Sequence, residues 1–249
     1  MTLYLIGLGL WDEKDISVKG LETAKKCDFV YLENYTSVML GTTPEKISAL
    51  VGKPITVLDR KAVEQDKKFM AQAKKSDVAL LIGGDPSVAT THIEIIQEAK
   101  KQKIKTQIIH ASSILSAVCE SGLFNYSFGK SCSIPFWSDK FKPESFYDVI
   151  VENMKNNAHT IVFLDLHPEA KKFMTVNDAL RVLLEIAAKR KKEISLNTIA
   201  VGFARVGSKN QVIKAGTIAE LLDFGFGAPM HILVIPGKLH FMEKEALGL

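Results

Sequence analysis

The chain has 249 residues, of which 47% are hydrophobic, and a formal net charge of +4. A chain of this length and apolar content can bury the core of one large α/β domain or of two small ones. The mild excess of basic residues argues against a dedicated nucleic-acid binder, which carries a denser basic patch.

The cysteines and histidines predict neither disulfides nor a metal site. None of the three cysteines belongs to a C-x-x-C pair, and the six histidines contain no H-x-x-x-H set. No apolar run reaches the length of a membrane span, and the apolar start of the chain lacks the basic segment of a signal peptide. We therefore expect a cytoplasmic protein with reduced thiols and no membrane partner.

The first half of the chain alternates short apolar runs with helical segments. The expected strands cover 2–6, 29–32, 55–58, 78–82 and 106–109. The expected helices cover 18–27 with Ser17 as N-cap, 44–50, 61–75, 91–101 and, capped by Ser112 or Ser113, a segment up to 120. Continuous apolar strands in alternation with helices predict a mostly parallel open sheet that is covered on both faces.

The second half predicts a mixed sheet. Its expected strands cover 131–135, 160–166, 198–205, 211–215 and 230–235, and its expected helices follow Pro143 and cover 176–191. Few helices separate the last strands, and 201–206 and 212–214 are typical of an antiparallel pair joined by the turn 207–210. We expect an N-terminal α/β domain at 1–125 and a C-terminal α/β domain at 126–249.

The loop 7–12 begins like the dinucleotide fingerprint G-x-G-x-x-G. Asp12 replaces the third glycine, and the next helix starts only near Ser17, too late to direct its N-terminus at a pyrophosphate. A nicotinamide-dependent dehydrogenase stays open as an alternative, with Glu33 as its ribose-binding acid, and so does a plain tight turn.

Two further loops follow buried strands, at the edge where open α/β sheets bind ligands. In the loop 83–88, Asp85 can accept hydrogen bonds from ribose hydroxyls or an ammonium group, or it can cap the next helix. In the loop 110–114, small residues leave room for a ligand or form an ordinary helix cap. A fourth loop, 225–231, ends in His231, and a lone histidine there is more often a core residue than a catalyst.

None of these loops contains a nucleophile–base pair, a metal cluster or a P-loop. Methyl transfer needs none of them, because a sulfonium donor is already activated and the protein has to align donor and acceptor and exclude water. Glycines, small residues and backbone groups suit that chemistry. No general base is visible in the sequence, so we expect solvent to take the proton.

In this order, the loops and their flanks resemble the diphthine synthase family, within the tetrapyrrole methylase-like class. The matching stretches span almost the whole chain and cover 3–10, 12–21, 31–37, 83–86, 131–137, 202–207 and 229–231. The G-D-P motif at 84–86 is shared with the wider class, whereas E-N-Y-T-S at 33–37 and S-I-P-F-W at 133–137 are far more specific.

The resemblance implies two α/β domains with S-adenosylmethionine bound in the cleft between them, and a homodimer. The mild net charge leads us to expect no nucleic-acid partner. The implied reaction methylates the 3-amino-3-carboxypropyl group on a histidine of elongation factor 2, as tri- or tetramethylation, and releases S-adenosylhomocysteine. A tetrapyrrole methyltransferase is the nearest alternative, and a non-catalytic interaction protein is a more distant one.

The resemblance also implies which residues bind the cofactor, namely Leu10, Asp85, Val88, Ser113, Ile114, Leu166, Val206 and His231. Backbone groups should dominate where the side chain cannot form hydrogen bonds, as at Leu10. Trp11 stands where the family mostly has glycine, so we expect the first loop to bend differently. The aromatic residues Tyr35, Phe136 and Trp137 either line a site for a quaternary ammonium or belong to the core or the dimer surface.

Overall fold

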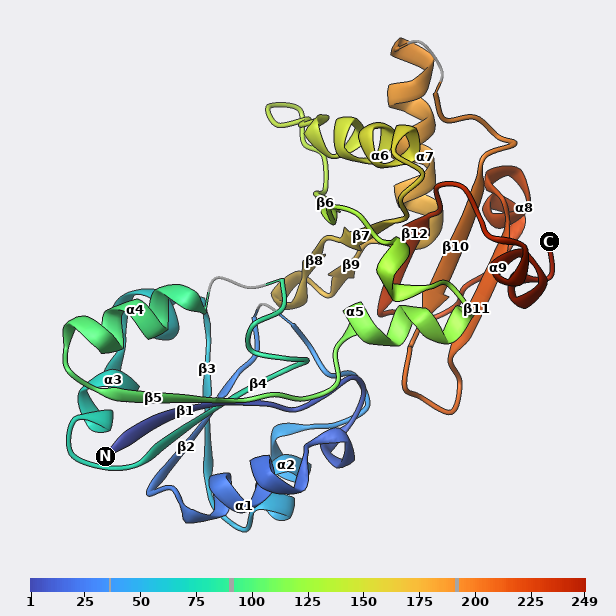
Figure 1. The fold of residues 1–249 in the computed structure, drawn as a ribbon. Helices are drawn as coiled ribbons and strands as arrows, with labels where there is room; N and C mark the ends of the chain where they lie inside the picture. The colour runs from blue at the N-terminus through green and yellow to red at the C-terminus, as the bar shows by residue number, and fades with distance from the viewer. Residues whose placement is uncertain (36, 90–91, 191–192) are drawn as a thin grey trace. The chain divides into compact units, whose positions relative to one another are not determined.

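The computed structural model describes residues 1–35, 37–89, 92–190 and 193–249 (Figure 1). The chain divides into two compact units, Met1–Ile114 and Leu115–Leu249, and each unit has its own five-stranded sheet. The sequence-based boundary between residues 125 and 126 stays a prediction. No helix in the described part of the chain is long and apolar enough to span a membrane.

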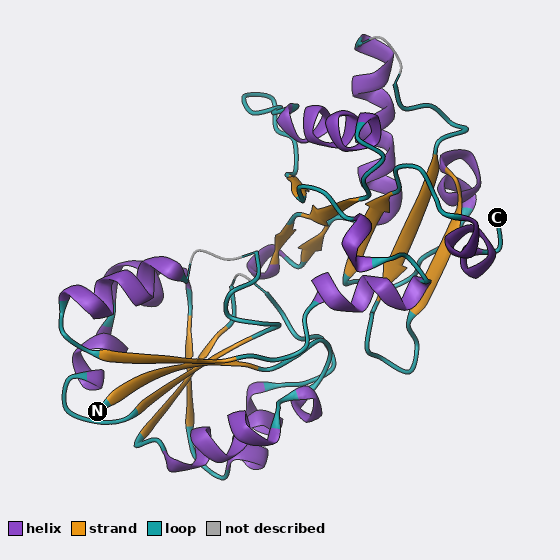
Figure 2. Ribbon diagram, viewed as in Figure 1, coloured by secondary structure: helices purple, strands orange, loops and turns teal. Residues whose placement is uncertain are grey.

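The sheet of the first unit is parallel, with the strand order β3-β2-β4-β1-β5. Its strands are β1 (Thr2–Gly7), β2 (Phe29–Glu33), β3 (Ile55–Leu58), β4 (Val78–Ile82) and β5 (Lys105–Ile109). Successive residues of a strand face opposite sides, and Leu80 and Leu81 accordingly belong to different core clusters. The predicted parallel sheet covered on both faces is confirmed, and helices lie on both sides of it (Figure 2).

Local capping signals set the ends of several helices in this unit. The helices are α1 (Val18–Lys26), α2 (Pro44–Val51), α3 (Lys68–Ala73) and α4 (Ile93–Lys101), and α5 (Ile114–Ala117) follows β5. The Ser17 hydroxyl accepts a hydrogen bond from the Gly20 N–H, which confirms the predicted N-cap of α1. The start of α4 predicted at residue 91 lies outside the described residues.

The prediction of a single helix over 61–75 is wrong, because the helix is interrupted at Lys67. A π-helical turn at Ala62–Asp66 ends in Lys67, whose φ of 46° is left-handed and whose N–H bonds to the carbonyl of Ala62. The α-helix that restarts after Lys67 buries Phe69 and Met70 in the core. Core packing therefore decides the helical phase, which a charge-rich sequence pattern does not reveal.

The sheet of the second unit is mixed and has the order β11-β10-β12-β7-β6. Its strands are β6 (Cys132–Ile134), β7 (Thr160–Leu164), β10 (Ile199–Ala204), β11 (Val212–Thr217) and β12 (His231–Ile235). Strand β6 pairs with β7 in parallel, whereas the remaining pairs are antiparallel. Both the mixed sheet and the β10–β11 hairpin confirm the prediction.

Four helices of the second unit are α6 (Ser145–Lys155), α7 (Val176–Lys189), α8 (Ile218–Asp223) and α9 (Phe241–Leu247). The sequence pattern predicts α6 and α7, although the end of α7 predicted at residue 191 lies outside the described residues. It misses α8 and α9, which are short and begin in capping boxes at Thr217 and His240.

The strand predicted for 160–166 is too long, because β7 ends at Leu164. The carboxylate of Asp165 accepts hydrogen bonds from the backbone N–H groups of Phe136 (2.8 Å) and Leu166 (2.9 Å), which turns the chain out of the sheet. The chain then forms a separate ribbon in which β8 (Leu166–His167) pairs with β9 (Lys172–Phe173).

Candidate functional site

Three of the predicted loops meet at the carboxyl edge of the first sheet. The strand order places β4, β1 and β5 side by side, so the segments that follow these strands are neighbours. The loops after β1 and β4 pair directly, since the Gly9 and Gly84 N–H groups each donate to the other's carbonyl, at 3.2 and 2.8 Å. Both glycines have a positive φ, 93° and 75°, which a larger residue adopts only with strain.

Gly7 makes this close approach possible. A Cβ atom on Gly7 would lie 2.6 Å from the carbonyl oxygen of Gly84 and 2.7 Å from the Cβ atom of Ala111. Neither neighbour is the flexible end of a side chain, so a larger residue would push the three loops apart. The close contact at this edge therefore depends on the absence of a side chain at position 7.

Asp85 joins the second loop to the third. Its Oδ1 atom accepts hydrogen bonds from the N–H and the hydroxyl of Ser87, at 2.9 and 2.7 Å. Its Oδ2 atom accepts from the N–H of Ala111 at 3.1 Å and faces Nδ1 of His110 at 2.9 Å. The chain's own donors thus engage the carboxylate, as expected of a residue that organises a loop, and a ligand contact through Asp85 stays a prediction.

The charge on Asp85 follows from these contacts. Burial by itself raises the pKa of a carboxyl group, but the hydrogen bonds from Ser87, Ala111 and His110 outweigh it and lower the pKa of Asp85 below its ordinary value. The group is therefore a carboxylate at neutral pH, although the residue is buried.

His110 is the exposed partner of this carboxylate. Its side chain is 70% exposed while Nδ1 faces Asp85. The sequence does not reveal this pair, because the two residues follow strands β4 and β5, between which β1 lies. The only available signal is that each residue lies in the loop after a predicted strand, at the same edge of a parallel sheet.

A buried pair, Glu33 and His92, contacts the loop 83–88 at the same edge. Nε2 of His92 lies 3.1 Å from Oε2 of Glu33, and its Nδ1 lies 3.3 Å from the carbonyl oxygen of Pro86. Both side chains are almost fully buried. Glu33 ends β2, so the pair connects the segment after β2 with the loop 83–88. Glu33 is thus part of the scaffold in this arrangement, whereas the dehydrogenase alternative requires it to bind ribose.

A small cavity opens beside the first two loops. Its volume is about 190 Å³, and its lining includes Leu8, Glu33, Asn34, Ser37 and Gly83. Pockets that enclose drug-sized ligands have volumes of roughly 300–1,000 Å³, so this cavity suits a group of side-chain size. Residue 36 of the specific 33–37 motif lies outside the described residues.

Trp11 is accommodated without the unusual backbone that a glycine would allow. Its N–H donates to Oδ2 of Asp15 at 2.7 Å, and it is not among the non-glycine residues of positive φ in the described chain. Its indole fills the space over Gly41, where a Cβ atom would lie 2.3 Å from Nε1. The loop is thus fixed by a bond to Asp15 and by contact with Gly41, and its contact to a cofactor through Leu10 stays a prediction.

In the second unit, Arg205 organises the segments around two predicted contacts, Val206 and His231. Its Nη1 donates to the carbonyls of Phe226, at 2.8 Å, and Ala228, and its Nε donates to the carbonyl of Asn210 at 3.0 Å. Its backbone N–H reaches the carbonyl of Met230 at 2.8 Å. Arg205 therefore holds the loop 225–230 against the end of β10.

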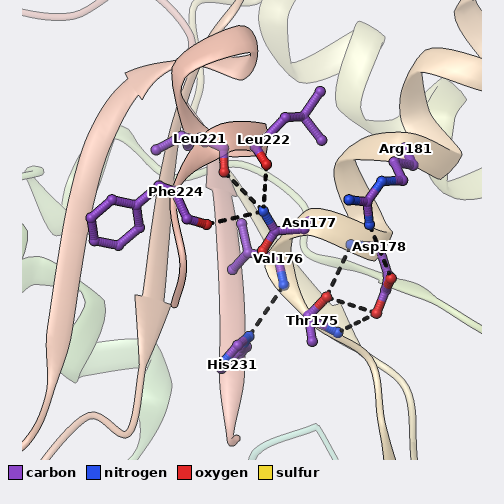
Figure 3. Close-up of polar contacts among 9 residues, drawn as sticks. All are labelled: Thr175, Val176, Asn177, Asp178, Arg181, Leu221, Leu222, Phe224 and His231. Atoms are coloured by element: carbon purple, nitrogen blue, oxygen red, sulfur yellow. Dashed lines mark hydrogen bonds and ion pairs between the residues drawn. The ribbon is translucent and has the colours of Figure 1, made fainter. Parts of the chain in front are cut away.

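Both ring nitrogens of His231 contact backbone groups of the second unit, and Figure 3 shows the contact with Val176. The N–H of Val176 donates to its Nδ1 at 3.3 Å, so the ring proton sits on Nε2, which donates to the carbonyl of Ala228 at 3.0 Å. Burial lowers the pKa of His231 below its ordinary value, which keeps the ring neutral. Both nitrogens are thus occupied, which leaves backbone groups for any ligand contact at this residue.

Asn177 fixes the other end of the loop 225–231 (Figure 3). Its Nδ2 lies 3.0–3.1 Å from the carbonyl oxygens of Leu221, Leu222 and Phe224, the last turn of α8 and its C-cap. One amide therefore ties the start of α7 to the end of α8, directly before the loop that leads to His231.

The predicted contacts fall into two groups. Leu10, Asp85, Val88, Ser113 and Ile114 lie on the joined loops of the first unit, and Leu166, Val206 and His231 lie in the second unit. Within the second unit, β10 and β12 bring Val206 near His231, because Ala204 pairs with His231, whereas Leu166 belongs to the β8–β9 ribbon.

Cations of the chain itself lie over the faces of the three aromatic candidates. The Arg60 guanidinium lies 5.2 Å from the ring centre of Tyr35, and Lys172 Nζ lies 4.0 Å from that of Phe136. Trp137 has Lys142 and Lys189 near its ring, at 5.6 and 5.3 Å. An ammonium ligand would have to compete with these residues.

Comparison with known proteins identifies the same family that the loops resemble. Residues 2–222 match the family model of the tetrapyrrole (corrin/porphyrin) methylases. The chain is 49% identical to a diphthine synthase of Methanosarcina mazei, over 98% of this chain and 94% of that protein. It is 47% identical to a diphthine synthase of Methanococcus maripaludis, over 98% and 97%. A crystal structure of diphthine synthase superposes with a TM-score of 0.90 at 41% identity, over 100% of this chain and 95% of that one.

Proposed function

The chain belongs to the tetrapyrrole methylase family and within it to the diphthine synthases, and from this premise we propose that it methylates the 3-amino-3-carboxypropyl group on a histidine of elongation factor 2. Like its relatives, it is an S-adenosylmethionine-dependent methyltransferase. One observation carries the substrate assignment. Relatives named diphthine synthase align with 98% of this chain at 47–49% sequence identity.

The reaction needs alignment more than it needs activation. The amine nitrogen attacks the methyl carbon of the sulfonium in line with the departing sulfur, and neutral S-adenosylhomocysteine leaves. Each transfer requires an unprotonated nitrogen, and each new methyl group produces an ammonium that must lose a proton before the next transfer. The proposed product carries a trimethylated amine, with esterification of the carboxylate as the open fourth step.

For the cofactor, we keep the full set of contacts predicted from the resemblance, Leu10, Asp85, Val88, Ser113, Ile114, Leu166, Val206 and His231. In the first unit, the support is the junction of the loops at Gly9 and Gly84, which presents backbone groups at the carboxyl edge of the parallel sheet. In the second unit, it is the network of Arg205 and Asn177, which fixes the segments that carry Val206 and His231.

Two further properties follow from the family alone and are part of the proposal. The enzyme works in the cytoplasm, where elongation factor 2 acts, and it does so as a homodimer. Sedimentation at micromolar concentration tests the second point, because a monomer mass would contradict it.

Mass spectrometry of the acceptor protein tests the substrate. Elongation factor 2 that carries the aminocarboxypropyl histidine is incubated with S-adenosylmethionine and the enzyme. Each methyl group that replaces a proton adds about 14 Da, and we expect successive additions of this size. Tight binding of S-adenosylhomocysteine without any addition would redirect the substrate towards a tetrapyrrole, which a spectral shift of an added porphyrinoid would reveal. No addition and no binding would refute the methyltransferase assignment for this chain.

A further inference from the structure

The Asp85–His110 pair has the geometry of a positioned base. A carboxylate can only accept hydrogen bonds, so the 2.9 Å contact places the proton of the neutral imidazole on Nδ1 of His110. The lone pair then lies on Nε2, which makes no hydrogen bond within the described residues. A carboxylate that fixes the tautomer in this way leaves Nε2 as the nitrogen that can take a proton.

No other histidine of the chain combines these features, and all six lie in the described residues. His92 and His159 are buried, with both ring nitrogens near chain partners. Both nitrogens of His231 are occupied as well. His167 turns Nε2 itself towards Asp165, at 3.5 Å, and His240 uses Nδ1 to cap α9.

The position of His110 adds a second, independent argument. It directly follows β5, at the edge where the three loops meet, and 70% of its side chain is open to solvent. A proton taken by Nε2 can therefore pass to water between successive methyl transfers. A buried base would lack this route and would hold its proton after the first transfer.

We propose that His110 is the general base that deprotonates the acceptor amine before each methyl transfer, and that Asp85 positions it. This inference rests on the proposed function. In each cycle Nε2 of His110 takes a proton from the acceptor ammonium, whose N–H bond electrons become the nitrogen lone pair. That lone pair forms the new bond from nitrogen to the methyl carbon. At the same time the bond from the methyl carbon to sulfur breaks, and the electron pair of that bond stays on the sulfur of S-adenosylhomocysteine. The proton on Nε2 then passes to water.

An acceptor of this kind needs a base because an α-amino group is mostly protonated at pH 7. Positioned general bases contribute about 10²–10⁴-fold to a rate. We therefore expect His110→Ala to lower the single-turnover rate by about 10²-fold or more at neutral pH, while S-adenosylhomocysteine binds as it does to the wild type.

Two variants and an added base separate catalysis from structure. His110→Gln keeps a side-chain N–H that can donate to Asp85 but has no basic nitrogen, so its loss of rate should match that of His110→Ala. Imidazole in the buffer should accelerate His110→Ala, whose vacated position is open to solvent, and should not accelerate the wild type. His167→Ala is the matched control, because it removes an exposed histidine beside a carboxylate and imidazole should not change its rate.

The outcomes distinguish this inference from the assignment of the substrate. If the wild type adds no methyl group to the modified elongation factor, the proposed function fails. If the wild type is active and both His110 variants stay within about tenfold of its rate, His110 is not the base. A loss of rate that parallels a loss of affinity for S-adenosylhomocysteine, without a response to imidazole, would make His110 a cofactor contact and would equally overturn the inference.

Discussion

Asp85→Asn should destabilise the first unit by about 2–3 kcal/mol. An amide offers one acceptor oxygen in place of two, so whichever way it turns, its NH₂ group faces the N–H of either Ser87 or Ala111. A buried N–H that loses its acceptor costs about 1–3 kcal/mol, and the hydrogen bonds to a charged acceptor that disappear are stronger than average. The expected loss is a large part of the 5–15 kcal/mol by which domains are usually stable.

Urea denaturation of the variant and the wild type measures this difference. Asp59→Asn is the matched control, because Asp59 accepts a single backbone hydrogen bond, from Ala62 at 2.8 Å, which asparagine can also accept. We expect the control to lie within about 0.5 kcal/mol of the wild type. An Asp85→Asn variant as stable as the control would refute the reasoning, since the carboxylate would then not hold the loops together.

The stability difference between the wild type and Asp85→Asn should depend on pH. The pKa of Asp85 is lower in the folded chain than in the unfolded chain, so its contribution is fully present above the ordinary pKa of about 3.9. The contribution is lost as the pH falls through the folded value. The difference in unfolding free energy between wild type and Asp85→Asn should therefore shrink as the pH falls below about 4.

Three further substitutions test the remaining supports. Gly7→Ala should lower both stability and affinity for S-adenosylhomocysteine, because its Cβ would lie 2.6 Å from the carbonyl of Gly84; calorimetry showing unchanged affinity would contradict this. For His231, whose pKa is lowered, the wild type should lose stability relative to His231→Gln as the pH falls below the ordinary value of about 6.5, and parallel pH curves would argue against a buried neutral ring. Asn177→Ala should cost about 1–3 kcal/mol by removing the amide donor of the Leu222 and Phe224 carbonyls, while the carbonyl of Leu221 keeps the N–H of Phe224. Denaturation of Asn177→Asp gives the matched comparison of equal size.

The sequence predicts those features that depend on neighbouring residues. The strand β3 is found at its observed bounds, Ile55–Leu58, because an apolar run between turn residues is a local pattern. The N-cap at Ser17 and the hairpin of β10 and β11 are likewise local. The break at Lys67 and the turn at Asp165 depend on core packing and on a hydrogen bond to Phe136, and no local pattern contains that information.

The candidate site shows the same division. The glycines and Asp85 are visible in the sequence, since each follows a buried strand, but the sequence carries no sign that β1 lies between β4 and β5. That strand order alone brings Asp85 to His110, which is why no base could be assigned from the sequence. Pairing across a parallel sheet is set by the whole core, so residues far apart in sequence become chemical neighbours only once the order is known.

Asp85 therefore serves both the architecture and the proposed chemistry. Its Oδ1 and Oδ2 atoms hold the second and third loops together, and the same Oδ2 orients His110. The two roles predict different losses: a change at Asp85 should reduce stability, donor affinity and rate together, whereas a change at His110 should reduce the rate alone. The 70% exposure of His110 explains the contrast, because a side chain open to solvent contributes little to packing. Measuring stability, donor affinity and rate for an Asp85 variant and a His110 variant therefore separates the structural role of Asp85 from the catalytic role proposed for His110.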